Sequence, residues 1–469
     1  MPYTLLKIFT RIAIRVFFRR IHFRNIDRIP GNIPVILCTN HQNAFLDALV
    51  LVVFIKRATY FLPRGDVFNS PFRRWFFNLV QMIPIYRIEE GADLLHKNEE
   101  TFQKCFDVLK KKNILHIFPE GICIQERRLR NLRKGAARIA LGAEEANNFN
   151  LDSAIVCAGI NYSKPYKFRS DLFINYSNPV KVLQFREIYL ENKALGINAF
   201  NDHVAKVLKR LMVHVEDKST DQLVEKIEVL YKSQLMSEFI MSSKNPGHDF
   251  LISKGIARAV NYFHKYEPEW VLELKEKINQ YFQELKKLNI KDYLIKKRTW
   301  DSLSRQKVGK GSGTRDFSTS FLSFLKIFIL LLLGFPFHLL GLMNNYLPCK
   351  IPQLIANKVI KRIEYYSSVV LLVGIFSFIL YYPVMILLVS LIFKSFWISL
   401  IYAIAMPLSG YYSLSYMDQY SRIRDKWIDM SLLRKRKENI GELINKRTEI
   451  IKELEKGKRE YMEEGMKRF

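Results

Sequence analysis

The sequence is poor in cysteine, and its few cysteines are too scattered to build a metal site or a disulfide framework. There are five among 469 residues, at Cys38, Cys105, Cys123, Cys157 and Cys349. Isolated cysteines favour a reducing compartment over a secreted, disulfide-linked fold. No group of residues has the spacing of a ligand cluster either, so we expect neither a resident metal nor a cofactor.

Acidic residues are absent from the first 26 positions. The apolar residues there are interrupted by Lys7, Arg11 and Arg15, so we expect no secretory signal peptide. Apolar and basic residues alternate as on an amphipathic helix, which can lie in the interface of a bilayer. We therefore predict a basic amphipathic membrane-surface helix over residues 1–26; the alternative is a helix packed on the domain core.

Negative charge is also in short supply overall. The chain has 73 Lys and Arg against 45 Asp and Glu, a formal net charge of +28, yet 49% of its residues are hydrophobic. This combination fits a protein held on an anionic membrane or one that binds nucleic acid. Nucleic acid is disfavoured, because many basic residues flank hydrophobic segments instead of forming one patch with interleaved aromatic residues.

Short apolar runs alternate with helical segments in the N-terminal part of the chain. The expected strands are residues 33–38, 58–62, 83–87, 114–118, 153–160, 172–176 and 180–183. Their length, branched side chains and bounding Gly or Pro residues are typical of strands. The pattern predicts an α/β domain over residues 27–190, with a mixed or parallel sheet flanked by helices.

The C-terminal half shows a different pattern. Residues 191–316 are expected to form a charged helical region that ends in a basic, Gly-containing linker, and residues 416–469 a solvated charged helix or short coiled coil. Between them, residues 317–415 contain runs of about the 20 apolar residues that span a bilayer core.

Within this membrane region we predict two spans, about 368–391 and 395–413, that form a hairpin. The run at 321–343 is broken by Gly334-Phe335-Pro336, so a third span and a kinked, re-entrant or interfacial segment both stay open. The flanks at 294–315, 350–362 and 422–437 are all basic. Positive flanks favour the cytoplasmic side, which agrees best with a first run that does not cross.

One His and one Asp stand at a predicted strand-to-helix turn, in Asn40-His41-Gln42-Asn43-Ala44-Phe45-Leu46-Asp47. An Asp that accepts a hydrogen bond from one imidazole nitrogen leaves the other free to take a proton. Six residues on one helix differ by about 240° in direction, so His41 must lie in the turn and Asp47 in the first helical turns. Taken alone, such a pair is usually an ordinary polar turn.

Three further stretches lie at or just after predicted strand ends. They are residues 83–87, which end on Arg87, then Phe118-Pro119-Glu120-Gly121, and residues 157–162. The carboxyl ends of parallel strands meet at one edge of a sheet, where α/β folds carry their sites. This predicts proton abstraction by His41 beside an anion-binding pocket made by Arg87. No Ser, Cys or Lys stands out as an activated covalent nucleophile.

The His41–Asp47 and Phe118–Gly121 motifs, in this order, resemble the first and third motifs of the phospholipid/glycerol acyltransferase superfamily. The resemblance covers about residues 5–185. The sequence departs from the common motifs at two places, and in both it is similar to the glycerol-3-phosphate and dihydroxyacetone-phosphate acyltransferases of yeasts and some bacteria. Five residues separate the His from the Asp in place of four, and Ile122-Cys123-Ile124 stands where many members have Thr-Arg-Ser. That branch also has a stretch like residues 132–138 and membrane helices after the catalytic domain.

The resemblance implies a membrane-bound O-acyltransferase of phospholipid biosynthesis. It would transfer a fatty acyl group from acyl-CoA or acyl-carrier protein, as co-substrate, to the hydroxyl of glycerol 3-phosphate. His41 would act as general base and Asp47 would hold its tautomer. The implied substrate-binding residues are Arg87, Glu120, Gly121, Arg64 and Lys134, with Arg130 as a further phosphate contact. For Arg64, Arg130 and Lys134, solvated surface charge is an equal alternative.

Two other functions stay open from the sequence. One is a 1-acylglycerol-3-phosphate (lysophosphatidate) acyltransferase, and the other is a basic membrane protein without enzymatic activity. The expected partners are membrane lipids, an acyl donor and a phosphorylated glycerol acceptor, and not nucleic acid. We expect a multi-pass membrane protein with its catalytic domain in the cytoplasm. The abundance of Ile, Lys and Asn agrees with a bacterial inner membrane, and an endoplasmic reticulum location stays open.

Overall fold

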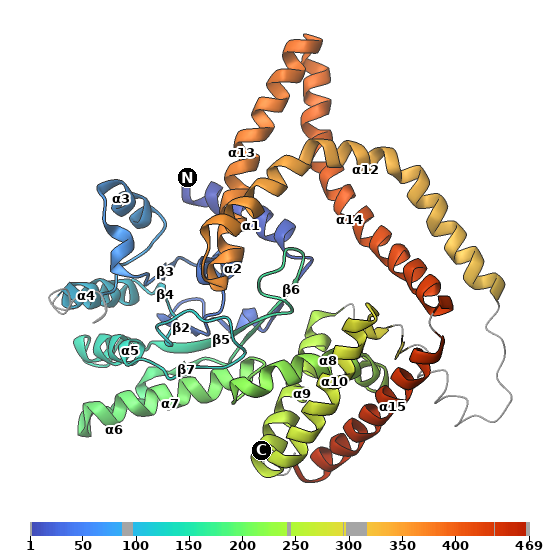
Figure 1. The fold of residues 1–469 in the computed structure, drawn as a ribbon. Helices are drawn as coiled ribbons and strands as arrows, with labels where there is room; N and C mark the ends of the chain where they lie inside the picture. Colours follow the sequence, from blue (N-terminus) through green and yellow to red (C-terminus); the bar gives the residue numbers. More distant parts are fainter. Residues whose placement is uncertain are drawn as a thin grey trace. The chain divides into compact units, whose positions relative to one another are not determined.

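The computed structural model describes residues 2–86, 97–241, 245–293, 295–296, 317–435 and 437–465. The chain forms two compact units. We call the first the α/β unit, which comprises Met1–Asp221, Met241–Ala257 and Val359–Leu371. The second, the helical unit, comprises Gln222–Ile240, Arg258–Lys358 and Leu372–Phe469 (Figure 1).

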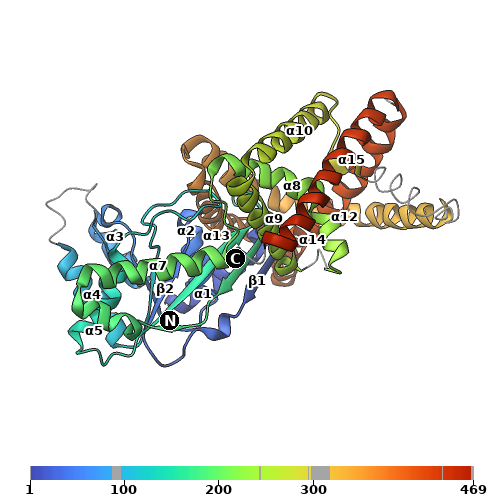
Figure 2. The same ribbon diagram turned by 90° about the horizontal axis from the view of Figure 1, so that it is seen from below.

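The α/β unit is built on a seven-stranded sheet (Figure 2). Its strands are β1 (Arg20–Arg24), β2 (Val35–Thr39), β3 (Thr59–Phe61), β4 (Ile114–Ile117), β5 (Ala154–Tyr162), β6 (Asp171–Tyr176) and β7 (Val180–Lys181). The order is β1-β6-β5-β2-β4-β3, with β7 paired to β5. β2 runs parallel to β4 and β5, whereas β5 runs antiparallel to β6 and β7. The predicted α/β class with a mixed sheet is confirmed.

Helices bury both faces of the central strands, which explains why these strands are continuously apolar. Every residue of β2 and β4 is buried. α4 (Lys97–Lys110), α5 (Gly135–Ala146) and α7 (Lys193–Leu211) pack around the core on one face. α1 (Pro2–Phe17) and α2 (Ala44–Val52) lie on the other side (Figure 1). α3 (Pro71–Leu79) and α6 (Arg186–Glu191) complete the helices named for this unit.

The first helix is shorter than the sequence predicts. It ends at Phe17, and Arg20–Arg24 instead form β1, an edge strand parallel to β6. Phe18 is buried between the two elements, and Arg19 and Arg20 both form ion pairs with Asp171 at the start of β6. Strand pairing and these ion pairs outweigh the local helical pattern, so the α/β fold begins before residue 27.

Two of the predicted strands are also reduced. In the stretch 83–87, Ile85 makes only an isolated parallel bridge with Arg64. The N–H groups of Ile83 and Ile85 donate to the Phe61 and Pro63 carbonyl oxygens, but Pro63 has no N–H to return the bond between them, so no continuous ladder forms. Arg87 lies outside the described residues. In 180–183 only two residues form a strand, and a 3₁₀ helix (Val182–Phe185) follows.

The helical region predicted for 191–316 is divided between the units. α7 belongs to the α/β unit, and its end lies so close to β5 that a Cβ on Gly159 would come within 2.3 Å of the Leu211 carbonyl oxygen. The α/β unit therefore extends beyond residue 190. α8 (Lys218–Glu238) and α9 (Pro246–Tyr266) have parts in both units.

The helical unit includes α10 (Pro268–Lys287), α12 (Phe317–Val359), most of α13 (Tyr366–Phe393), α14 (Phe396–Lys435) and α15 (Lys437–Glu460). α15 was expected as a solvated helix or short coiled coil. Ile440, Leu443 and Ile451 are buried, and the helix packs on α10, so it is not a solvated helix. Arg447 on α15 also forms a buried ion pair with Asp292 at 2.9 Å. The apolar spacing of α15 is therefore a core-facing stripe.

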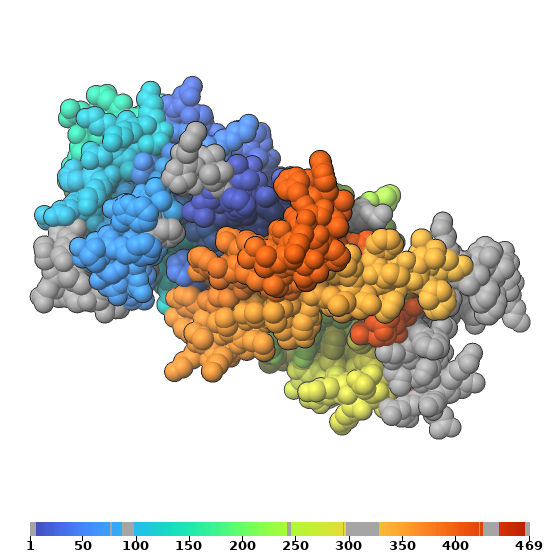
Figure 3. Space-filling view, turned by 90° about the horizontal axis from the view of Figure 1, so that it is seen from above, coloured from blue at the N-terminus to red at the C-terminus, as the bar shows by residue number. Residues whose placement is uncertain are grey.

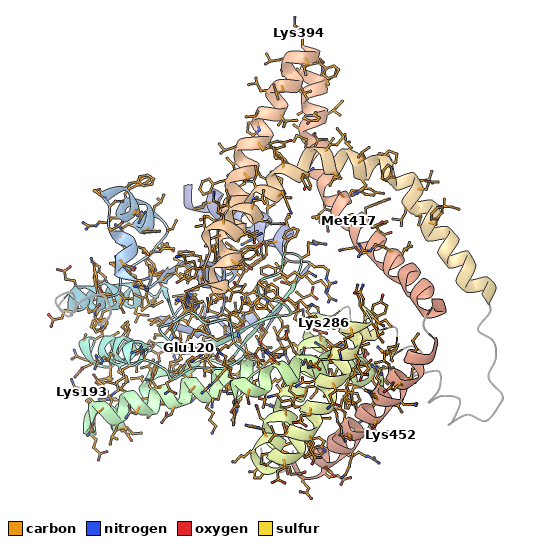
Figure 4. All side chains as sticks on the ribbon, viewed as in Figure 1. Glu120, Lys193, Lys286, Lys394, Met417 and Lys452 are labelled. Carbon is orange, nitrogen blue, oxygen red and sulfur yellow. The ribbon has the colours of Figure 1, made fainter. Side chains whose placement is uncertain are left out.

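Two helices among the described residues are long and apolar enough to cross a membrane. They are Phe328–Val359, with a mean hydropathy of 1.6, and Ile363–Phe393, with 2.4. The second contains the predicted span 368–391. The other predicted arm, 395–413, forms the first half of α14, which follows the turn at Lys394 (Figure 4). α14 is not one of the two, and its Pro407, Ser409 and Gly410 lower its apolar character.

Candidate active site

The loop that follows β2 is anchored to the neighbouring strand by Asn40. This side chain is 1% exposed. Its amide nitrogen donates to the Ile160 carbonyl oxygen at 3.0 Å, and its amide oxygen accepts from the Ile160 N–H at 2.7 Å. Asn40 therefore continues the pairing of β2 with β5 by one residue and holds the start of the loop in place.

His41 and Asp47 meet as the sequence geometry requires, with His41 in the loop and Asp47 in the first turn of α2. The Nδ1 atom of His41 lies 2.9 Å from Asp47 Oδ2. The same oxygen accepts the backbone N–H groups of Gln42 and Asn43, each at 2.7 Å. The fully buried Asp47 carboxylate thus organises the loop as well as the imidazole.

The other Asp47 oxygen is held from the sheet. Tyr162, the last residue of β5, donates its hydroxyl to Asp47 Oδ1 at 2.5 Å. Burial, followed by the Asp47 charge, raises the pKa of Tyr162 well above its usual value, so this phenol stays protonated as a donor. The carboxylate accepts hydrogen bonds on both oxygens and is restrained against rotation.

The His41 ring is oriented from a second direction by Phe118. The two rings stack with centroids 3.8 Å apart and planes 16° from parallel. Asp47 occupies Nδ1, and 16% of the His41 side chain is exposed. This arrangement leaves Nε2 as the ring nitrogen that can accept a proton from a bound hydroxyl.

Glu120 joins the backbone on both sides of the site. Its Oε1 accepts from the His41 N–H at 3.0 Å, and its Oε2 accepts from the Arg130 N–H at 2.9 Å. Burial raises the pKa of Glu120 to about 7, although the two backbone hydrogen bonds act in the opposite direction. The sequence suggested a contact with a substrate hydroxyl or with Arg87; the structure shows a carboxyl that joins two loops.

Gly121 is required by the turn that carries Glu120. Its φ is +66°, and an added Cβ would lie 2.9 Å from Arg133 Cγ. A side chain here would be strained by the backbone conformation and would also displace Arg133. Gly121 therefore shapes the turn and exposes no functional group of its own.

The raised pKa of Glu120 predicts that the free energy of unfolding depends on pH. The carboxyl ordinarily ionises near pH 4.5, whereas in the folded protein its pKa is about 7. Between these values the unfolded chain releases a proton that the folded chain keeps, so stability falls as pH rises, by about 3 kcal/mol at most. We expect Glu120→Gln to remove this part of the pH dependence, whatever its effect at a single pH. Chemical unfolding between pH 4.5 and 7.5 tests it, and parallel curves for both proteins would contradict it.

Cys123 is a part of the site that the motif analysis missed. Its sulfur accepts the Ala44 N–H at 3.1 Å, and the next residue, Ile124, donates its N–H to the His41 carbonyl oxygen at 3.3 Å. Burial raises the pKa of Cys123 above its usual value, so the thiol stays neutral. The signal was present in the sequence, since Ile122-Cys123-Ile124 is where the chain departs from the Thr-Arg-Ser pattern.

His41, Asp47 and Cys123 also offer potential metal ligands within 4.8 Å of one another. The thiol is neutral, and the Nδ1 atom and the carboxylate already bond to each other. A cation would have to displace the Cys123 proton and break the His41–Asp47 hydrogen bond. The three side chains are therefore arranged as a hydrogen-bonded imidazole–carboxylate pair beside a neutral thiol, and this arrangement does not suit a metal.

The remaining predicted contacts lie around this centre. Arg64 follows β3 and forms a half-exposed ion pair with Asp66 at 2.8 Å. Arg130 forms an ion pair with Glu126 at 2.6 Å, and Lys134 is exposed at the start of α5. The structure thus brings His41, Asp47, Glu120 and Gly121 together. Phosphate binding by Arg64, Arg87, Arg130 and Lys134 stays a prediction.

The His41–Asp47 pair follows the carboxyl end of β2, and the Phe-Pro-Glu-Gly turn follows that of β4. These are the two motifs whose order in the sequence resembles the acyltransferase superfamily. Residues 20–160 match the family model Acyltransferase. This part of the chain is therefore an acyltransferase domain of the phospholipid/glycerol acyltransferase superfamily.

Individual relatives act on glycerol phosphates, as their names state. Glycerol-3-phosphate O-acyltransferase 2 of Saccharomyces cerevisiae is 24% identical over 277 residues, 58% of this chain and 34% of its own length. Glycerol-3-phosphate O-acyltransferase 1 of the same yeast is 25% identical over 42% of this chain and 25% of its own length. A chloroplastic 1-acyl-sn-glycerol-3-phosphate acyltransferase of Arabidopsis thaliana is 25% identical over 29% of this chain and 36% of its own length.

The chain spans about a quarter to a third of the length of these relatives. Among solved structures, the 1-acyl-sn-glycerophosphate acyltransferase of Thermotoga maritima matches 44% of this chain and 77% of its own, with 15% identity and a TM-score of 0.32.

Proposed function

We propose that this protein transfers a fatty acyl group from a thioester, acyl-CoA or acyl-carrier protein, to the hydroxyl of glycerol 3-phosphate. The observation that carries the proposal is the His41 Nδ1–Asp47 Oδ2 hydrogen bond of 2.9 Å, held beside the Glu120 turn. The match of residues 20–160 to the Acyltransferase family supports the reaction class.

The geometry supports a direct transfer with one base. As the acceptor oxygen attacks the thioester carbonyl, His41 Nε2 takes the hydroxyl proton, and Asp47 stabilises the imidazolium that forms. The tetrahedral intermediate then collapses: the C–S bond breaks, the ester remains, and the departing thiolate takes the proton from His41. Because a thiolate leaves readily, positioning and a base suffice without a covalent acyl-enzyme.

The choice of glycerol 3-phosphate rests on two observations. Five residues separate His41 from Asp47, as in the yeast and bacterial branch that the sequence resembles, and the yeast relatives are named for this acceptor. The chloroplastic relatives favour a second candidate, a 1-acyl-sn-glycerol-3-phosphate acyltransferase. We infer that the acceptor phosphate binds Arg87, with Arg64, Arg130 and Lys134 as further contacts.

Acceptor competition is the decisive experiment. Purified full-length protein is assayed with one labelled acyl-CoA and either glycerol 3-phosphate or lysophosphatidate, each over a range of concentrations. The proposal requires the higher kcat/KM with glycerol 3-phosphate. A higher value with lysophosphatidate selects the second candidate. Transfer to neither acceptor, from acyl-CoA or from acyl-carrier protein, contradicts both candidates.

We further propose that the protein crosses the membrane more than once, with the catalytic domain on the cytoplasmic side. The apolar helix at Ile363–Phe393 and the first half of α14 support a hairpin of two spans. The basic flanks at 350–362 and 422–437 favour the cytoplasmic side for both ends of this hairpin. α1 adds a surface contact. It packs Ile14 and Phe17 into the core but exposes Ile8, Phe9 and Ile12, each by about half. α3, on the same face, exposes Phe72 and Trp75 (Figure 3).

The proposed contact of α1 with the membrane predicts that a probe on its exposed face enters an apolar environment in vesicles. In a Cys349→Ser background, a Phe9→Cys variant carries an environment-sensitive fluorophore and is reconstituted into vesicles that contain anionic lipid. We expect apolar emission and strong quenching by lipid-attached quenchers, because residue 9 enters the acyl boundary. A fluorophore on Lys206→Cys of α7, on the other side of the sheet, serves as control. Equal quenching at both positions would contradict the contact.

A further inference from the structure

The beginning of α13 contacts the His41–Asp47 loop directly. The Ser368 hydroxyl oxygen accepts the Leu46 N–H at 3.0 Å and donates to the Asn43 carbonyl oxygen at 2.8 Å. Leu46 and Ser368 are 322 positions apart in the sequence, yet Ser368 is only 3% exposed. α13 thus starts beside α2 (Figure 1), and Ser368 binds both groups of the Asn43–Leu46 turn, whose own N–H···O bond measures 2.9 Å.

Neighbouring residues of the same segment strengthen this contact. Ser367 is fully buried and donates its hydroxyl to the Pro165 carbonyl oxygen at 2.7 Å. The Asn43 side-chain amide donates to that same carbonyl oxygen at 2.7 Å. On the other side of the loop, Arg362 Nη2 donates to the Cys123 carbonyl oxygen at 3.0 Å. The segment 362–368 therefore meets both the loop and the Cys123 stretch that supports it.

The Asn43 peptide connects Ser368 with the proposed base. Its N–H donates to Asp47 Oδ2, and its carbonyl oxygen accepts from Ser368. A shift of this loop moves the hydrogen bonds that orient Asp47, and Asp47 orients the imidazole. Because a misplacement of about 1 Å can cost about 10²-fold in rate, a buried hydroxyl at this position bears on catalysis without touching substrate.

The longer loop accounts for the need for such a residue. Five residues between His41 and Asp47 contain more peptide groups than Asp47 alone can hold. Asp47 accepts the N–H groups of Gln42 and Asn43, and Cys123 accepts that of Ala44. The Leu46 N–H is shared between the Asn43 carbonyl oxygen at 2.9 Å and the Ser368 hydroxyl at 3.0 Å. Ala44 adopts a φ of +39°, a conformation that a non-glycine residue keeps only when its surroundings enforce it.

We propose that Ser368 is a positioning residue for acyl transfer, and that the start of α13 completes the catalytic loop. This inference rests on the proposed function of His41 and Asp47. It makes the reaction depend on a segment outside residues 20–160, the part that matches the family. It also places the reaction centre at the beginning of Ile363–Phe393, a helix long enough to cross a membrane, where a lipid product forms beside the bilayer.

The test uses the full-length protein and substitutions of one hydroxyl. Ser368→Ala is expected to lower kcat by about 10- to 100-fold, with KM for donor and acceptor within about twofold of the original protein. Ser399→Ala is the matched control. Ser399 is similarly buried at 8% exposure, but its hydroxyl donates to the carbonyl oxygen of Ser395, the residue just before α14. We expect no change in kcat for this variant.

A second pair of variants separates the hydroxyl from the packing. Ser368→Thr and Ser368→Val add nearly the same volume and differ in one hydroxyl, so Thr should exceed Val in kcat by about tenfold or more. Equal activity of this pair, or a Ser368→Ala variant within twofold of the original, would overturn the positioning role. His41→Ala is assayed alongside. If His41→Ala keeps its acyl transfer activity, the proposed function itself is overturned. If His41→Ala loses activity while Ser368→Ala keeps it, the role of Ser368 alone is overturned.

Discussion

Replacing His41 by alanine is expected to lower kcat for acyl transfer by about 10²–10⁴-fold, the usual contribution of a general base. Three contacts set the position of His41: Asp47 holds Nδ1, Phe118 stacks on the ring, and Glu120 accepts the backbone N–H. Alanine removes the proton acceptor and leaves the backbone hydrogen bond to Glu120 in place. The fold should therefore persist, as circular dichroism and thermal unfolding can check.

The control for His41→Ala is another histidine of the α/β unit. His203 on α7 lies against the ring of Phe185, and His203→Ala should keep kcat within about twofold, because surface changes away from a site have small effects. Activity is measured as transfer of labelled acyl groups by the purified full-length protein. A His41→Ala variant with more than about a tenth of the original kcat would refute the role of His41 as general base.

Asp47→Asn is expected to damage both activity and stability. The carboxylate accepts four hydrogen bonds, from the His41 ring, the Gln42 and Asn43 N–H groups and the Tyr162 hydroxyl. An asparagine has a single acceptor oxygen, so its NH₂ group must face at least one of these donors. We expect a fall in kcat of about 10²–10⁴-fold and a loss of about 2–4 kcal/mol in the free energy of unfolding.

Tyr162→Phe separates the two effects of Asp47. It removes the hydroxyl that bonds Oδ1 and leaves the three donors on Oδ2, including the His41 ring. We therefore expect a loss of about 1–3 kcal/mol in stability and less than about a tenfold loss in kcat. Asp47→Asn and Tyr162→Phe are compared by acyl transfer and chemical unfolding under the same conditions. If Asp47→Asn keeps the original kcat, the carboxylate does not orient the base.

Much of the site could be predicted from the sequence, because its parts are local. The apolar run before Asn40 is short and rich in branched residues, and it forms β2. The step of six residues from His41 to Asp47 required a turn followed by a helix, and the structure has both. The Phe-Pro-Glu-Gly stretch after the next buried strand followed the same logic. Strands that alternate with helices place their ends at one edge of a sheet, so His41 and Glu120 meet there.

The tertiary structure alone decided what depends on distant pairing. Residues 20–24 have the pattern of a helix but form a strand, because β6 supplies a partner and Asp171 pairs with Arg19 and Arg20. The bond from Ser368 to Leu46 spans 322 positions. Hydrophobic periodicity reports the environment of neighbouring residues, whereas a hydrogen bond between remote segments depends on how the whole chain packs. For this reason the His41–Asp47 pair could be recognised in the sequence, and the contact of Ser368 with its loop could not.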